Sequence, residues 1–222
     1  MDDFSEQQFL DFHTHSQHHC DRTDITEIIS IHLGQDKSAK YFTVGLHPWW
    51  TTYPISVFDK LVLKDKLAAT NCLAMGEMGL DKLKGQSMDL QIKVLTSQLQ
   101  IAHELGKPVI IHCVRAIDQL LQVKKMFPNI QKWCIHGYGR NIILAKQLID
   151  QGFYLSLMPP KDPTKYETYF KELPHSRLFL ETDSMAGIDI EEIYLQVVEV
   201  TGIEMHALKK QMTQNAKTFF QI

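Results

Sequence analysis

Histidines and carboxylates that follow apolar segments are the residues of this sequence best suited to chemistry. His13 and His15 stand two positions apart after Leu10 and Phe12, so on a strand both imidazoles lie on one face. Such a pair can bind one metal ion. Alone the pair is a weak signal, because histidines packed in a core are more common than ligand pairs.

Four further groups of this kind each come at the end of another apolar segment. They are Glu77, His112, His136 and Asp183. Each has a simpler interpretation, as a packed core histidine, a strand-end carboxylate that faces solvent, or a turn cap. A carboxylate in an apolar setting is costly unless it is paired or metal-bound, however, and five segments that end alike favour one shared metal centre.

The donor atoms of these six residues are imidazole nitrogens and carboxylate oxygens, with no thiolate. This set suits Mg²⁺, Mn²⁺ or Zn²⁺, and the sequence leaves the choice among them open. Six groups that include a central carboxylate, Glu77, are enough to hold two divalent ions.

The elements that must position these groups are short apolar strands that alternate with amphipathic helices, a pattern typical of βα units. Eight strands are predicted: Gln8 to His13, Glu27 to Leu33, Tyr41 to Leu46, Leu73 to Met78, Pro108 to His112, Lys132 to His136, Phe153 to Leu157 and Arg177 to Thr182.

Three helices have clear sequence signals. Apolar residues recur at three- and four-residue steps from Ile92 to Leu105. Two later helices begin at Asn141 and Asp189 and end before Gly152 and Gly202.

Eight strands in alternation with helices predict an α/β fold of the (β/α)8 TIM-type barrel, as one domain over residues 1–222. The carboxyl ends of the strands meet at one face of such a barrel, which would gather the six groups. A doubly wound open sheet is the structural alternative.

Composition limits the class of substrate and the location. A net charge of −3 gives no general attraction to a polyanion, so a nucleic acid would be held locally by metals or a few cations. No apolar run reaches the roughly 18 residues of a membrane helix. We expect a cytoplasmic monomer.

The cysteines form neither a C-x-x-C pair nor the dense pattern of a small secreted scaffold. We expect them to be reduced and mostly buried. They are Cys20, Cys72, Cys113 and Cys134.

Several ordered motifs carry a resemblance to a known family. They are Asp11 to His15, Gly45 to Pro48, Gly76 to Asp81, Ile111-His112, Ile135 to Gly139, and Glu181 to Asp183. In this order they resemble the TatD family of metal-dependent deoxyribonucleases, amidohydrolase-like barrels, over nearly the whole chain.

The resemblance implies an enzyme that cleaves phosphodiester bonds of DNA, with DNA or a nucleotide as its substrate. It implies that His13, His15 and Asp183 hold one divalent ion, that His112 and His136 hold a second, and that Glu77 bridges the two. A metal-activated water would then attack phosphorus, with Asp183 as the acceptor of its proton.

Four residues are candidates for further roles. His47 can stabilise developing charge or protonate the leaving oxygen, or it packs in its loop. Trp49 and Trp50 can stack on an unpaired base, or they pack over the barrel mouth. Arg115 is a candidate phosphate contact, although the family often has its arginine two residues after the strand-five histidine, and here it stands three after.

One departure from the family concerns the first half of the chain. Only 25 residues lie between His15 and Tyr41, so we expect a slightly truncated barrel whose outer helices are short or absent there.

Two other functions remain open. A binuclear centre also polarises carbonyl groups, which allows an ester or amide hydrolase such as an aminoacyl-tRNA deacylase. A non-catalytic nucleic-acid-binding barrel is the second alternative, and the presence of all six ligands argues against it.

Overall fold

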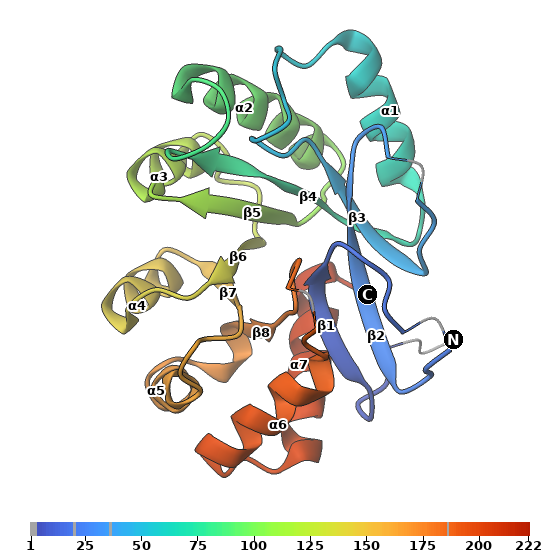
Figure 1. Ribbon diagram of the computed structural model, residues 1–222. Coiled ribbons are helices and arrows are strands. Elements are labelled where there is room, and N and C mark those ends of the chain that lie inside the picture. The colour runs from blue at the N-terminus through green and yellow to red at the C-terminus, as the bar shows by residue number, and fades with distance from the viewer. Residues whose placement is uncertain (1–3, 20, 36, 186) are drawn as a thin grey trace. The chain divides into compact units, whose positions relative to one another are not determined.

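The computed structural model describes residues 4–19, 21–35, 37–185 and 187–222. Strands and helices alternate along most of the chain (Figure 1). The strands are β1 (Phe9–Thr14), β2 (Ile25–His32), β3 (Tyr41–Gly45), β4 (Cys72–Asp81), β5 (Val109–Val114), β6 (Trp133–Tyr138), β7 (Phe153–Leu157) and β8 (Leu178–Leu180). The helices are α1 (Val57–Ala68), α2 (Met88–Glu104), α3 (Ile117–Lys125), α4 (Ile142–Asp150), α5 (Thr164–Glu172), the 3₁₀ helix η1 (His175–Arg177), α6 (Ile190–Thr201) and α7 (Met205–Phe220).

The strands follow one another in chain order, β1 to β8. Parallel pairing joins β1 to β2, β3 to β4, β4 to β5, β5 to β6, and β7 to β8. This arrangement is that of the (β/α)8 TIM-type fold and confirms all eight predicted strands. Between β1 and β3, the described residues form no helix. The expected truncation of the outer layer is therefore confirmed.

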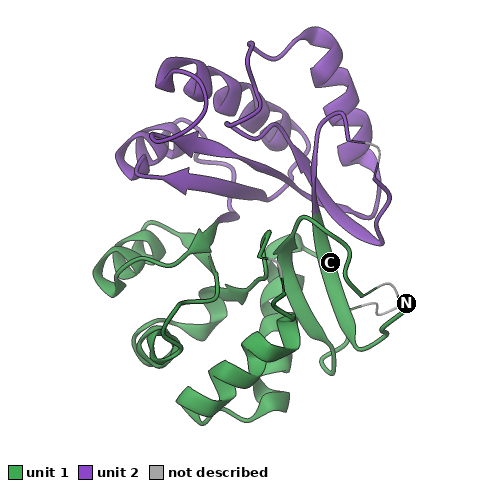
Figure 2. Ribbon diagram, viewed as in Figure 1, with its two compact units in different colours: residues 1–29, 136–222 green, residues 30–135 purple. Residues whose placement is uncertain are grey.

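The chain divides into two compact units (Figure 2). Unit 1 comprises Met1–Ile29 and His136–Ile222, and unit 2 comprises Ser30–Ile135. The expectation of one domain over residues 1–222 stays a prediction.

An aromatic stack forms the centre of unit 1. Phe12 of β1 stacks on Phe179 of β8, with 3.8 Å between ring centroids, and Phe219 of α7 meets both rings edge-on. All three side chains are fully buried. Because Phe12 alternates with Asp11 and His13 along β1, this stack turns the polar groups to the opposite face.

Unit 2 is built around α2, which packs on β4. Its buried residues include Leu95, Leu99 and Ala102, which confirms the middle of the predicted helical spacing. Ile92 is half-buried, and Leu105 is exposed because the helix ends at Glu104. Two buried glutamines of α2 hold strand ends. Gln98 exchanges hydrogen bonds of 2.7 and 3.1 Å with the backbone of Leu46, and Gln91 does the same with Asp81 at 2.7 and 3.0 Å.

The expected ends of the two later helices are confirmed. Asn141 and Asp189 accept hydrogen bonds from the first turns of α4 and α6, and Gly202 ends α6 with a φ of 70°.

Cys72 and Cys134 are buried and Cys113 is half-buried, whereas Cys20 lies outside the described residues. No helix in the described part of the chain is long and apolar enough to cross a membrane. The monomeric state and the cytoplasmic location stay predictions.

Candidate metal centre

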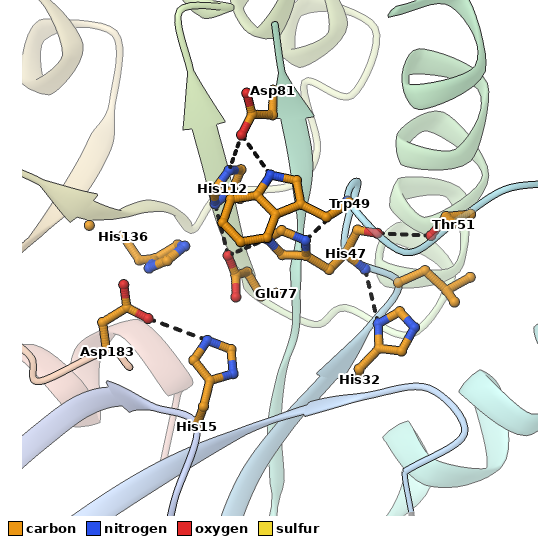
Figure 3. Close-up of polar contacts among 12 residues, drawn as sticks. His15, His32, His47, Trp49, Thr51, Glu77, Asp81, His112, His136 and Asp183 are labelled. Atoms are coloured by element: carbon orange, nitrogen blue, oxygen red, sulfur yellow. Dashed lines mark hydrogen bonds and ion pairs between the residues drawn. The ribbon is translucent and has the colours of Figure 1, made fainter. Parts of the chain in front are cut away.

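Unit 1 brings His13, His15 and Asp183 together where β1 and β8 end. Asp183 N donates to His13 O at 2.9 Å, and a parallel bridge joins Thr14 to Asp183. His15 Nε2 lies 3.3 Å from Asp183 Oδ1 (Figure 3). One ligand atom from each of the three residues lies within 4.8 Å of the others, so the trio can hold a metal ion.

Asp11 fixes the turn that carries Asp183. It accepts hydrogen bonds from Thr182 N at 3.0 Å and from Thr182 Oγ1 at 2.5 Å. Burial raises the pKa of Asp11 to about 8 and outweighs these hydrogen bonds, which lower it. Asp183 itself has a left-handed backbone with a φ of 53°, a conformation rare for a residue with a Cβ atom.

His136 lies next to this trio, with its ring centroid 4.1 Å from that of His13. Glu181 stands beside it. Glu181 Oε1 accepts a hydrogen bond from Gly137 N at 2.5 Å and is 3.5 Å from His136 Nδ1. His136, Glu181 and Asp183 form a second group that can hold a metal ion.

The surroundings of the Glu181 carboxylate show whether a cation fits the ligand group of unit 1. Its side chain is fully buried, and its Oε2 has no hydrogen-bond partner among the described residues. A buried carboxylate with unused lone pairs is costly unless positive charge compensates it. Nitrogen and oxygen donors around such a group therefore fit a divalent cation.

Unit 2 brings Glu77, His47 and His112 together. Glu77 Oε1 lies 2.9 Å from His47 Nε2 and 2.9 Å from His112 Nδ1 (Figure 3). Trp49 N donates to His47 Nδ1 at 3.1 Å, so neutral His47 carries its proton on Nε2, which donates a hydrogen bond to Glu77 Oε1. These three side chains also form a group that can hold a metal ion.

Asp81 lies behind His112. Its Oδ2 is 3.1 Å from His112 Nε2 and accepts a hydrogen bond of 2.7 Å from Trp49 Nε1, while Oδ1 accepts from the backbone of Leu83 at 2.7 Å. Burial raises the pKa of Asp81, but the hydrogen bonds from Trp49, His112 and Leu83 outweigh burial and lower it. A carboxylate behind a metal-binding histidine fixes the orientation and tautomer of its ring.

Sequence reasoning assigned no role to Asp81 or Glu181. The available signal was strand alternation, which places Asp81 on the face of Glu77 and Glu181 on the face of Asp183.

The predicted substrate contacts all lie in unit 2. Trp49 is half-buried, with Lys84 Nζ 3.6 Å from the centroid of its ring, and Trp50 is exposed. Arg115 is exposed directly after β5 and has a φ of 52°. The substrate roles of Trp49 and Arg115 stay predictions.

Four of the six predicted ligands therefore lie together in unit 1, and the other two lie together in unit 2 beside His47. The unit 1 ligands are His13, His15, His136 and Asp183, and those of unit 2 are Glu77 and His112. That the six serve one centre, and that Glu77 bridges two ions, stays a prediction.

Comparison with solved structures supports the fold. The crystal structure of YJJV, a TatD homolog from Escherichia coli K12, matches with a TM-score of 0.77 and 20% sequence identity, and the match covers 98% of this chain and 100% of that chain.

Comparison with known sequences identifies relatives. The uncharacterized metal-dependent hydrolase YabD of Bacillus subtilis strain 168 is 27% identical over 219 residues, 91% of this chain and 85% of YabD. The human 3'-5' RNA nuclease TATDN2 is 28% identical over 148 residues, 63% of this chain but 19% of that protein. A family model described as TatD related DNase matches residues 13–221. The chain thus belongs to the TatD related DNase family of metal-dependent hydrolases.

Proposed function

We propose that the protein hydrolyses phosphodiester bonds of DNA with the help of divalent metal ions. The observation that carries this proposal is that each unit gathers histidines and carboxylates into a group whose ligand atoms lie within 4.8 Å of one another. Such nitrogen and oxygen donors match ions that assist phosphoryl hydrolysis.

The proposed ligands are those expected from the sequence: His13, His15, Glu77, His112, His136 and Asp183. Two ions, each Mg²⁺, Mn²⁺ or Zn²⁺, fit this number of donors. When bound, such ions polarise a phosphoryl group and lower the pKa of water.

Side chains of the protein would accept or donate the protons and orient the reacting groups. Asp183, held by its backbone beside His13, is the proposed acceptor of the attacking water's proton. Its contact with His15 at 3.3 Å keeps the carboxylate oriented. His47 donates a hydrogen bond to Glu77 and is the proposed group that stabilises developing charge or protonates the leaving oxygen.

The proposed substrates are single strands or short nucleic acids. A chain of net charge −3 has little general attraction for a long duplex, so local contacts must provide the affinity. The family name favours DNA, and the human relative's name, an RNA nuclease, makes RNA the comparison substrate.

The test uses metal-stripped protein with labelled single-stranded DNA, single-stranded RNA and bis-p-nitrophenyl phosphate, with Mg²⁺, Mn²⁺ or Zn²⁺ added in turn. We expect metal-dependent cleavage of DNA that Glu77→Gln lowers by about 100-fold or more. The matched control is Glu104→Gln, which removes an exposed carboxylate paired with Lys64 in the same unit and should leave cleavage unchanged.

Metal bound without cleavage of any phosphodiester would overturn the proposal. Turnover of an aminoacyl ester or an amide under the same conditions would then establish the carbonyl alternative.

A further inference from the structure

Trp50 is unusually exposed for a tryptophan, since 52% of its surface is accessible. It is nevertheless held in place. Its ring meets His32 edge-on at 5.1 Å and lies 4.9 Å from the ring of His47, while its backbone N donates to His47 O at 3.2 Å. A large aromatic surface therefore stands in solvent with its orientation fixed.

The neighbouring Trp49 is already engaged. Its Nε1 donates to Asp81, and the Lys84 ammonium lies 3.6 Å from the centroid of its ring. The two indoles are perpendicular, with centroids 6.3 Å apart, so Trp49 brings an exposed cation to the vicinity of Trp50. Trp49 thus positions Lys84, and Trp50 is the tryptophan whose ring is exposed for contact with a ligand.

We propose that Trp50 and Lys84 form a binding surface for an unpaired nucleotide, whose base stacks on Trp50 and whose phosphate meets Lys84. Exposed aromatic rings beside cations bind single strands in this way, because every base has a π-face and every linkage a negative charge. A base inside a duplex is already stacked and cannot lie on Trp50. The occupant is therefore a single strand.

The surface adjoins the ligand group of unit 2. Trp50 contacts His47, and His47 Nε2 lies 2.9 Å from Glu77 Oε1. A nucleotide stacked on Trp50 would thus lie beside these groups. The inference rests on the proposed function for its substrate, but it can be tested without turnover.

Binding is measured by fluorescence anisotropy of a labelled oligothymidylate, and of an oligouridylate, on metal-free protein in EDTA. Trp50→Leu keeps apolar area but removes the large π-face, and we expect it to weaken binding by roughly 5- to 150-fold. Trp50→Phe should weaken binding less. The control Leu61→Ala, at an exposed site of α1, should bind like the wild type.

Lys84→Ala should lower the slope of log affinity against log salt concentration by about 0.7, the loss of one phosphate contact with a single strand. An unchanged slope, or a Trp50→Leu variant that binds both oligonucleotides like the wild type, would overturn the surface. The two oligonucleotides show whether DNA or RNA binds more tightly. Binding of either one supports the proposed surface.

Kinetics give a second readout. Thymidine 5′-(p-nitrophenyl phosphate) and methyl p-nitrophenyl phosphate share a leaving group, but only the first has a base. In Trp50→Leu we expect the ratio of their kcat/KM values to fall by roughly 5- to 150-fold, mainly through a higher KM for the thymidine ester. An equal loss for both esters would assign Trp50 a merely structural role. Oligonucleotide binding without cleavage of any phosphodiester would contradict the proposed function but support the binding surface formed by Trp50 and Lys84.

Discussion

Asp81 Oδ2 lies 3.1 Å from His112 Nε2, on the side of the imidazole opposite Glu77, which is 2.9 Å from His112 Nδ1. The pKa of Asp81 is lowered because hydrogen bonds from Trp49, His112 and Leu83 outweigh the effect of burial. An ionised Asp81 favours a proton on Nε2, which leaves the Nδ1 lone pair available as a ligand.

Asp81→Asn should therefore weaken metal binding at His112 by about 10- to 100-fold, the usual effect of losing such a supporting carboxylate. Isothermal titration calorimetry with Mn²⁺ or Zn²⁺ measures this loss without any substrate. Asp89→Asn is the matched control, an exposed aspartate in the first turn of α2. Equal affinity in the two variants would contradict the role assigned to Asp81.

The strands and the six candidate ligands were predictable because each depends on local sequence. A buried strand of a parallel sheet is a nearly continuous apolar run, and a His, Glu or Asp at its end interrupts that run visibly. Asp81 and Glu181 were harder to interpret. Asp81 acts on His112, 31 residues away, and Glu181 lies beside His136, 45 residues away. Such pairings arise only once the strands lie side by side.

Glu181→Gln tests the cation fit in unit 1. The wild-type carboxylate is buried with one oxygen lacking a hydrogen-bond partner among the described residues, so a bound cation relieves a cost that the neutral amide does not carry. A ligand at 100 times its Kd stabilises the fold by about 2.7 kcal/mol, and a tenfold loss of affinity removes about 1.4 kcal/mol of this. Thermal unfolding with and without Mn²⁺ should show a smaller rise in Tm for the variant.

Glu172→Gln is the control for that experiment, because Glu172 is an exposed carboxylate of unit 1 that pairs with Lys146. Its rise in Tm should equal that of the wild type. If Glu181→Gln gave the same rise, Glu181 would have no part in metal binding.

Strand ends were the least predictable part of the fold. β4 was expected to end at Met78 but continues to Asp81, and this extension pairs with β5. β8 was expected to reach Thr182 but ends at Leu180. The backbone N–H of Thr182 donates instead to the side chain of Asp11 in β1. In both cases the boundary depends on contacts with residues of another strand, which the local sequence does not reveal.

Gly79 makes the extension of β4 possible. Its φ is +156°, and a Cβ atom there would clash with the carbonyl oxygen of His112. Gly79→Ala should therefore lower the free energy of unfolding by about 3 kcal/mol or more, because β4 and β5 must separate where Gly79 pairs with His112. It should also weaken metal binding, because His112 is a proposed ligand and Glu77 lies two residues before Gly79. Urea unfolding measures the first effect and calorimetry the second.

Gly106→Ala separates steric clash from backbone strain. Gly106 has a φ of +63°, and no atom lies within 4 Å of the position that a Cβ atom would take there. Its substitution should therefore cost about 1–2 kcal/mol and leave metal binding intact. Equal effects of the two substitutions would show that close strand approach at Gly79 does not matter.

Cys72 provides a prediction about pH. Burial raises the pKa of its thiol from 9.0 to about 12, more than Lys107 and Lys66 lower it. The thiol thus stays protonated in the folded state at pH values where the unfolded chain has lost that proton. The unfolded state binds fewer protons between about pH 9 and 12, so the contribution of Cys72 to stability falls as pH rises through this window.

At pH 8.5, iodoacetamide should modify the half-buried Cys113 and spare Cys72 until the protein unfolds, as peptide mass spectrometry would show. Equal alkylation of Cys72 and Cys113 in the folded protein would contradict the buried, protonated state of Cys72.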